Sequence, residues 1–272
     1  MKKIFTISIL FIVFILAFQS CSTNNVTKDE SLKKYFDEHN VEGCFALYDN
    51  GQNHFSIYNL SRFKDSAYSP ASTFKIVNSL IGIHTGRIFD EKMVIPWDGV
   101  TRKISDWNQD LTMAQAFQYS SVPYYQEVAR RIGKDTMQIW LDSLQYGNKK
   151  IGKHVDSFWL DNTLKITSDE QLGLVKKIYF QQLNIDKRAQ RIVKQVMLRE
   201  SNSNYQLSYK TGWGSKEDGK SLGWIVGWIE ENKHVYFFVL NIEGNKDTSI
   251  PSAREKILKG ILNQYGFFQG RK

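Results

Sequence analysis

Hydrophobic residues follow a strand period at both ends of the chain and a helix period between them. Runs rich in β-branched and aromatic residues predict strands at 41–48, 54–59, 206–210, 222–230 and 234–243. Apolar residues three or four apart predict helices at 32–38, 69–83, 112–118, 123–132, 134–144, 168–183, 187–199 and 252–265. Asn50-Gly51 and Glu231-Asn232-Lys233 predict hairpin turns, and Ser69-Pro70 is expected to cap and open the second helix.

Strands at both ends with helices between them imply one sheet that is built from both termini. We therefore expect an α/β fold of three layers, α-β-α, with an antiparallel sheet and an inserted all-helical subdomain at roughly 86–200. The folded domain would extend over 31–272, after a polar tether at 21–30.

The first residues have the pattern of an export signal. Lys2 and Lys3 precede an almost purely apolar stretch at 4–18, which at about 15 residues is short for a membrane span and suits a secretory signal peptide. Ser20-Cys21 resembles a bacterial lipoprotein signal, in which residues 1–20 are removed and the lipidated Cys21 anchors the protein to a membrane. Ordinary cleavage near Ser20 is the alternative. We expect an exported protein of the periplasm or cell envelope.

The composition changes this picture little. Of the 272 residues, 42% are hydrophobic, which is enough for a sizeable core and argues against disorder. The net charge is +8, but basic residues are spread among acidic ones and no nucleic-acid-binding motif is present, so we expect no nucleic-acid partner. If Cys21 carries lipid, Cys44 has no partner and is expected to be a small thiol in a buried strand.

The candidate chemistry begins with Ser72-Thr73-Phe74-Lys75. A serine and a lysine three residues apart at a helix start place a hydroxyl and an amine one turn apart on the same face, where the helix N-terminus stabilises negative charge. Ser31/Lys34 and Ser61/Lys64 have the same spacing, which is usually a solvated helix face. Only Ser72/Lys75 follows a Ser-Pro helix start and precedes an apolar run.

Two more motifs follow in order. Ser120-Ser121-Val122 stands before Pro123, and Lys210-Thr211-Gly212 ends a predicted strand. Lysine and threonine at a strand edge supply a cation and a hydroxyl for a substrate carboxylate, and glycine lets a ligand lie against the strand backbone. Three such elements, with a helical insertion between the first and the last, are typical of penicillin-recognising serine enzymes.

Over essentially its whole mature length the chain resembles the class D, or oxacillinase-type, serine β-lactamases. Four motifs carry this resemblance: the three above and Tyr146-Gly147-Asn148. Phe158-Trp159-Leu160 and Arg254 stand where the class has a buried tryptophan and a carboxylate-binding arginine. The resemblance implies the β-lactamase–transpeptidase-like fold, hydrolysis of the β-lactam amide bond and antibiotic resistance.

The resemblance also implies a general base that differs from the glutamate of class A enzymes, since Val122 replaces their asparagine. A lysine amine is a base only when it is neutral, and its ordinary pKa of about 10.4 prevents this in water. An apolar niche of Phe74, Val122, Trp159 and Leu160 would favour neutral Lys75. The amine could then add carbon dioxide and become a carbamate, N6-carboxylysine, held by the indole N–H of Trp159.

The remaining roles come from the same resemblance. Ser72 is the expected nucleophile, and the backbone N–H groups of Ser72 and Trp213 form the oxyanion hole. Ser120 relays a proton, and four residues bind the substrate carboxylate: Lys210, Thr211, Gly212 and Arg254. No cofactor is expected beyond carbon dioxide or bicarbonate, and no metal. Trp107 is a candidate lip of the cleft, with simple packing as the alternative.

Other readings remain open at this stage. A penicillin-binding transpeptidase would form the acyl-enzyme but hydrolyse it slowly. A β-lactam sensor domain usually has asparagine where Val122 stands, and a lipid-tethered module could carry inert motifs. The five histidines lack metal-binding spacing, which disfavours a zinc β-lactamase. The substrate spectrum and the oligomeric state are not readable from the sequence.

Overall fold

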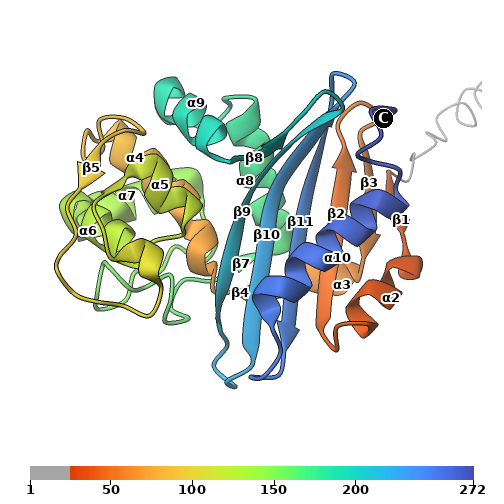
Figure 1. The fold of residues 1–272 in the computed structure, drawn as a ribbon, viewed down its shortest axis with the longest axis horizontal. Helices are drawn as coiled ribbons and strands as arrows, with labels where there is room; N and C mark the ends of the chain where they lie inside the picture. Colours follow the sequence, from red (N-terminus) through yellow and green to blue (C-terminus); the bar gives the residue numbers. More distant parts are fainter. Residues whose placement is uncertain (1–24) are drawn as a thin grey trace, which may run out of the picture.

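A seven-stranded sheet, whose strands come from both ends of the chain, forms the centre of the fold (Figure 1). The computed structural model describes residues 25–272, so the expected signal peptide and Cys21 lie outside the described residues. The strand order is β1-β3-β2-β11-β10-β9-β8. All pairs are antiparallel except β1 and β3, which run parallel. The strands are β1 (Val26–Lys28), β2 (Glu42–Asp49), β3 (His54–Tyr58), β8 (Leu198–Ser201), β9 (Tyr205–Ser215), β10 (Ser221–Glu231) and β11 (His234–Gly244).

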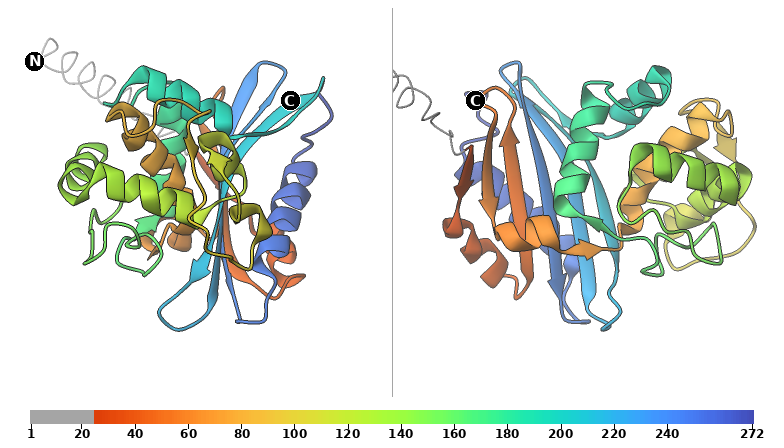
Figure 2. Two further views of the ribbon diagram at one scale, coloured as in Figure 1. Left: turned by 60° about the vertical axis from the view of Figure 1, so that its left-hand side comes forward. Right: turned by 180° about the vertical axis from the view of Figure 1, so that it is seen from behind.

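Helices cover both faces of this sheet and confirm the three-layer α-β-α architecture. On one face lie η1 (Glu30–Leu32), α2 (Lys33–Asp37) and α10 (Ile250–Gln264). On the other face α8 (Ser168–Tyr179) packs against β10 and β11, with α3 (Leu60–Asp65) beside it, as the view from behind in Figure 2 shows. A separate hydrophobic cluster fills each side of the sheet.

The remaining helices gather beside the sheet, next to β9 (Figure 1). Their apolar faces share one core with the α8 side of the sheet. Two short ribbons, β4 with β7 and β5 with β6, tie their connections together. These elements are β4 (Ala67–Tyr68), η2 (Ala71–Phe74), α4 (Lys75–His84), β5 (Val94–Ile95), η3 (Ser105–Trp107), β6 (Leu111–Thr112), α5 (Met113–Gln118), α6 (Val122–Ile132), α7 (Lys134–Leu144), β7 (Ile166–Thr167) and α9 (Lys187–Val196).

Several boundaries differ from the sequence prediction. Residues 26–28, assigned to the tether, form β1 because β3 offers them a parallel partner. The helix predicted at 187–199 ends at Val196, and β8 follows it. Although it falls within 86–200, α8 belongs to a layer over the sheet. No helix within residues 25–272 is long and apolar enough to cross a membrane.

Two predicted turn devices also work differently from expectation. The hairpin between β2 and β3 forms, but its positive φ falls on Asn53, while the Asp49 carboxylate accepts hydrogen bonds from the backbone N–H groups of Gly51 and Gln52. Ser69 does not cap the following helix. Its hydroxyl donates instead to the backbone carbonyl of Trp159, at 2.7 Å, so this serine ties the nucleophile segment to a distant loop.

Candidate active site

Ser72 and Lys75 form a direct pair at the junction of η2 and α4. The Lys75 Nζ atom lies 2.8 Å from Ser72 Oγ. The segment enters this turn through Ala71, which has a φ of 48°, in the left-handed region that side chains other than glycine rarely adopt. Such strain is found where the surrounding structure holds a functional residue in place.

The amine of Lys75 is completely buried, with no exposed surface. Burial lowers the pKa of this lysine from its ordinary 10.5 to about 7, because the charged form loses its hydration. Among residues 25–272, no carboxylate forms an ion pair with Lys75 to oppose this effect. The ring of Tyr125, on α6, lies 5.5 Å from Nζ. A substantial fraction of the amine is therefore neutral near pH 7.

An aromatic cluster surrounds the residue before this lysine. The Phe74 ring stacks on Trp159 with centroids 5.2 Å apart, and Phe158 and Tyr146 also contact Phe74. Trp159 is fully buried, yet its Nε1–H has no hydrogen-bond partner. A buried N–H without a partner costs about 1–3 kcal/mol, and this one belongs to the ring that stacks on Phe74, the neighbour of Lys75 in the chain.

The loop that carries Trp159 is held by Tyr146-Gly147-Asn148. Gly147 has a φ of 53°, and a Cβ atom there would lie 2.1 Å from the carbonyl oxygen of Lys165. Asn148 donates to that carbonyl from its backbone and to the carbonyl of Thr163 from its side chain. This tight turn closes the loop between α7 and β7.

Ser120 and Lys210 form a second pair. The Lys210 ammonium donates to Ser120 Oγ at 2.9 Å and to the carbonyl of Thr211 at 3.1 Å. Ser120 follows α5 with a φ of 56°, and Ser121 caps α6 by accepting from the N–H of Tyr124. Burial, with Lys75, Arg199 and Arg254 nearby, holds the pKa of Lys210 well below its usual range.

Gly212 brings this strand against the turn that carries Ser72. A Cβ atom at Gly212 would lie 2.9 Å from the carbonyl oxygen of Pro70 and 3.2 Å from Cγ2 of Thr73. The glycine therefore allows β9 to approach η2 closely, a reason that differs from the ligand contact expected from the sequence. Arg254, on α10, donates from Nη1 to the carbonyl of Gly212 at 2.6 Å, while its buried Nε has no partner.

The other predicted site residues differ in their exposure to solvent. Val122 is the first residue of α6 and is half-buried, and Leu160 packs partly buried against the core. Trp213, on β9, is 56% exposed, so its side chain stands open to solvent at the strand next to Gly212. Thr211 is half-buried in the same strand.

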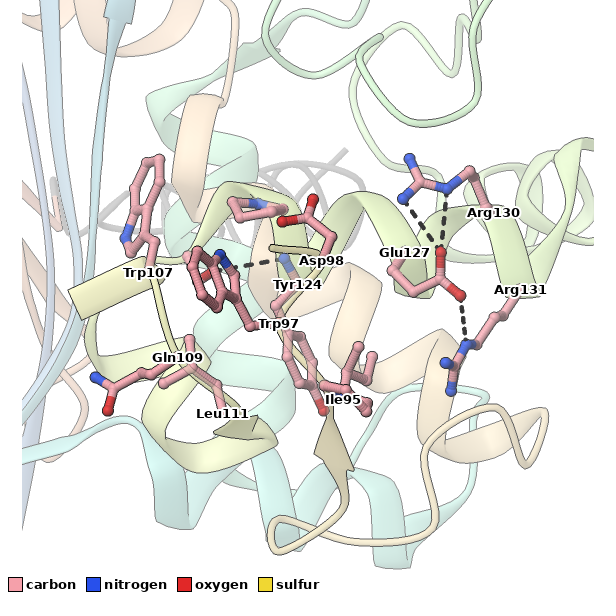
Figure 3. A pocket seen from close by; sticks show the side chains of 13 residues that line it. Ile95, Trp97, Asp98, Trp107, Gln109, Leu111, Tyr124, Glu127, Arg130 and Arg131 are labelled. Atoms are coloured by element: carbon pink, nitrogen blue, oxygen red, sulfur yellow. Dashed lines mark hydrogen bonds and ion pairs between the residues drawn. The ribbon is translucent and has the colours of Figure 1, made fainter. Parts of the chain in front are cut away.

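A cavity of about 200 Å³ lies beside the site, and its walls do not include Ser72 or Lys75. Trp97 and Trp107 line one end, and Glu127 between Arg130 and Arg131 lines the other (Figure 3). Trp107 donates from its indole to the carbonyl of Tyr119, next to Ser120. Trp107, the expected lip of the cleft, therefore lines this cavity and supports the turn that carries Ser120.

Sequence reasoning missed several residues that support the two pairs. The Gln171 amide on α8 donates to Thr73 Oγ1 at 2.6 Å, and the Trp224 indole donates to the carbonyl of Ser69 at 2.9 Å. Arg199, on β8, reaches Gln118 and the carbonyl of Tyr209. Each contact joins segments far apart in the sequence, so no local motif announces it.

Comparison with known proteins gives the same family from sequence and from structure. The family model described as "Penicillin binding protein transpeptidase domain" matches residues 21–263. The chain is 38% identical over 262 residues to "Beta-lactamase OXA-48" of Klebsiella pneumoniae, covering 96% of this chain and 98% of that one. The crystal structure of a class D β-lactamase from Sebaldella termitidis superposes with a TM-score of 0.85 and 31% identity, covering 90% and 98% of the two chains. The chain belongs to the class D β-lactamases.

Membership makes this class D β-lactamase a serine hydrolase of the penicillin-recognising group. The fold extends beyond enzymes, because the C-terminal domain of the Bacillus licheniformis BlaR penicillin-receptor superposes with a TM-score of 0.84 and 28% identity over 89% of this chain and 97% of that one. The fold alone therefore does not distinguish a β-lactam-hydrolysing enzyme from a β-lactam receptor. The residues of the site have to distinguish them.

Proposed function

We propose that this class D β-lactamase hydrolyses the amide bond of penicillin-type β-lactams through a Ser72 acyl-enzyme, with carboxylated Lys75 as its general base. One observation carries the proposal: a fully buried amine lies 2.8 Å from the nucleophile, next to the stacked Phe74 and Trp159 rings, where an indole N–H has no partner. An amine in this place is neutral enough to react, and the unpaired donor fits the product.

Carbon dioxide would supply the base. The lone pair of neutral Lys75 Nζ attacks the carbon of CO₂, and the nitrogen loses a proton, which leaves a carbamate anion. Its oxygens can accept the hydrogen bond that Trp159 Nε1 now lacks. Lys210, which the charge of Lys75 influences, is a neighbouring cation that favours an anion at this place.

Acylation and deacylation would then use the same base. The carbamate takes the Ser72 proton while Oγ attacks the lactam carbonyl, and the backbone N–H groups of Ser72 and Trp213 hold the oxyanion. The ring C–N bond breaks, and the proton on the carbamate passes through Ser120 to the nitrogen, which restores the carbamate anion. In the second half the carbamate takes a proton from water as the water oxygen attacks the ester carbonyl, and the protonated carbamate gives that proton to Ser72 Oγ as the ester C–O bond breaks.

The substrate carboxylate would be held by the cations of the site. Lys210 presents an amine beside Ser120, Thr211 a hydroxyl, and Arg254 a guanidinium against Gly212. The substrate carboxylate would favour the charged form of Lys210, against the burial that lowers its pKa. Among the residues the structure describes, neither Lys210 nor Arg254 is neutralised by an ion pair. A site with several cations and no paired acid favours an anionic substrate.

Bicarbonate dependence tests the base. Because the pKa of Lys75 is about 7, the amine is mostly protonated at pH 6 and the carbamate is lost there. We expect hydrolysis of a chromogenic cephalosporin to fall at pH 6 in CO₂-stripped buffer and to recover when bicarbonate is added. Addition of ¹³C-bicarbonate should give a carbamate carbon signal that Lys75→Ala lacks. Full turnover without bicarbonate at pH 6 contradicts the carbamate and leaves Ser72 untouched.

Variants of the niche sharpen this test. Trp159→Phe keeps a ring for stacking on Phe74 and removes only the N–H, so the bicarbonate needed for half-maximal activity should rise at least about tenfold, the effect of losing one hydrogen bond to a charged group. Trp159→Ala and Val122→Asn should slow deacylation more than acylation. Unchanged bicarbonate dependence in Trp159→Phe would exclude the indole as the carbamate donor.

The form of the time course separates this function from its relatives. Sustained turnover supports the enzyme, whereas a single stoichiometric burst is the behaviour of a sensor or a transpeptidase.

We further propose export with lipidation at Cys21 and a role in β-lactam resistance. Radiolabelled palmitate incorporation that disappears in Cys21→Ser tests the first, and the resistance of a susceptible host that expresses the gene tests the second.

A further inference from the structure

Arg199 stands at a β-bulge on the outer strand of the sheet. The register of β8 against β9 shifts between Leu198 and Glu200, which leaves Arg199 as the extra residue. A bulge re-aims the side chain of the residue that it adds. Here the guanidinium reaches Gln118 at the end of α5, and it is half-buried.

This guanidinium contacts both segments that carry the second pair of the site. Its Nη1 donates to Gln118 Oε1 and, at 3.4 Å, to the Gln118 carbonyl, two residues before Ser120. Its Nε donates at 3.2 Å to the carbonyl of Tyr209, the residue before Lys210. Gln118 is fixed in turn, because its amide donates to the carbonyls of Val196 and Leu198.

We propose that Arg199 is a positioning residue for Ser120 and Lys210: it joins the backbone before each of them and places a permanent positive charge behind the pair. The inference rests on the proposed function, because the pair acts there on the ring nitrogen and the substrate carboxylate. The hydrogen bonds of Arg199 also support the left-handed backbone of Ser120, whose φ of 56° costs energy by itself.

The charge of Arg199 has an effect that its packing does not. The groups around Lys210 are Lys75 on α4, Arg199 on β8, Arg254 on α10 and, on α5, the ring of Phe117 at 5.5 Å. Burial first, and then these cations, lower the pKa of Lys210. Removal of the Arg199 charge therefore raises that pKa. Because Lys210 must be charged to hold the substrate carboxylate, the alkaline limb of kcat/KM should move to higher pH.

Four variants separate the effect of the Arg199 charge from the effect of its hydrogen bonds to Gln118 and Tyr209, which we call the clamp. Acylation is followed by stopped flow in bicarbonate-saturated buffer. Arg199→Met should slow acylation about tenfold and move the alkaline limb up by about half a pH unit. Arg199→Lys and Gln118→Met keep the charge and lose the clamp, so acylation slows and the limb stays. Arg191→Met removes an exposed arginine of α9 and should change neither.

Each result decides the inference. An unchanged acylation rate in Arg199→Met overturns it. Slower acylation without a shift of the alkaline limb would mean that Arg199 acts through packing and not through its charge, and this also overturns it. If Arg199→Met does not fold, the two variants that keep the charge decide instead. An alkaline limb that moves in Arg199→Lys or Gln118→Met overturns the inference. Wild-type protein that fails to turn over sinks the proposed function instead, so the two failures are distinguishable.

Discussion

At the scale of single residues, the site depends on a lysine kept in an unfavourable place. A buried amine with a pKa of about 7 opposes folding, since the unfolded chain would keep its proton up to about 10.5. Between these values the unfolded state binds more protons than the folded one. The stability of the wild type should therefore rise with pH across this window.

Lys75→Met should make the protein more stable and inactive. In CO₂-free buffer we expect a gain on the order of 1–3 kcal/mol at pH 6, where the destabilisation is complete, and a smaller gain at pH 9. Urea unfolding at both values measures it. Lys177→Met, at an exposed position of α8, is the control and should show no such difference between the two. A destabilised Lys75→Met at pH 6 would contradict the argument.

The residues of the first pair were readable from the sequence because their contact is local. Ser72 and Lys75 are three residues apart, so helical geometry alone brings them to 2.8 Å. Arg199 was not readable, since its direction depends on a bulge that exists only when β8 pairs with β9. The close approach of Pro70 and Thr73 to Gly212 was not readable either, because it exists only in the folded protein.

At the scale of elements, the loop between α7 and β7 determines where Trp159 stands. Its start is fixed by Gly147 and Asn148 against Lys165, and its middle by the hydrogen bond from Ser69 to the Trp159 carbonyl. The first anchor includes a backbone hydrogen bond and the second is a side-chain hydroxyl that donates to a backbone carbonyl, so a small displacement of either would move the Trp159 indole.

Gly147→Ala should disturb this loop and slow deacylation. The added Cβ would lie 2.1 Å from the Lys165 carbonyl, whereas Gly133 also has a positive φ, 81°, with nothing within 4 Å of its Cβ position. We expect both alanine variants to lose about 1–2 kcal/mol from backbone strain, measured by urea unfolding. Only Gly147→Ala should need more bicarbonate for turnover. Equal kinetic effects in the two variants would show that strain alone is responsible.

Elements with strong local patterns were predicted well, and those defined by their neighbours were not. The helix at 134–144 matches α7 at both ends. By contrast, apolar Met197 continues the helical spacing of α9, and only pairing with β9 turns the following residues into a strand. Residues 26–28 are similar, because three mostly exposed residues gain strand structure only beside β3.

At the scale of the whole molecule, the two hydrophobic clusters share one sheet. Cys44 lies in β2, is fully buried and contacts Ser168 of α8 through its sulfur at 3.3 Å. Burial raises the pKa of this thiol to about 11, so it is neutral and unreactive in the folded protein. Exposure of Cys44 requires α8 to leave the sheet or the central strands to separate.

The thiol of Cys44 should therefore report global unfolding. In a Cys21→Ser background it is the single cysteine of the chain, and we expect its labelling by a thiol reagent to follow the loss of activity and of circular dichroism across a urea series. Coincident transitions indicate one cooperative unit. Labelling of protein that is still active would show that the sheet opens locally.

The pairing of β2 with β11 joins residue 42 to residue 243, which decides when the molecule can become an enzyme. A ribosome must have produced nearly the whole polypeptide before these central strands can meet, and pairings so distant along the chain form slowly. A newly made chain threaded through a membrane would cross as an unpaired polypeptide and assemble its sheet only on the far side. A copy truncated before β11 lacks this central pairing, so we expect it to hydrolyse no antibiotic.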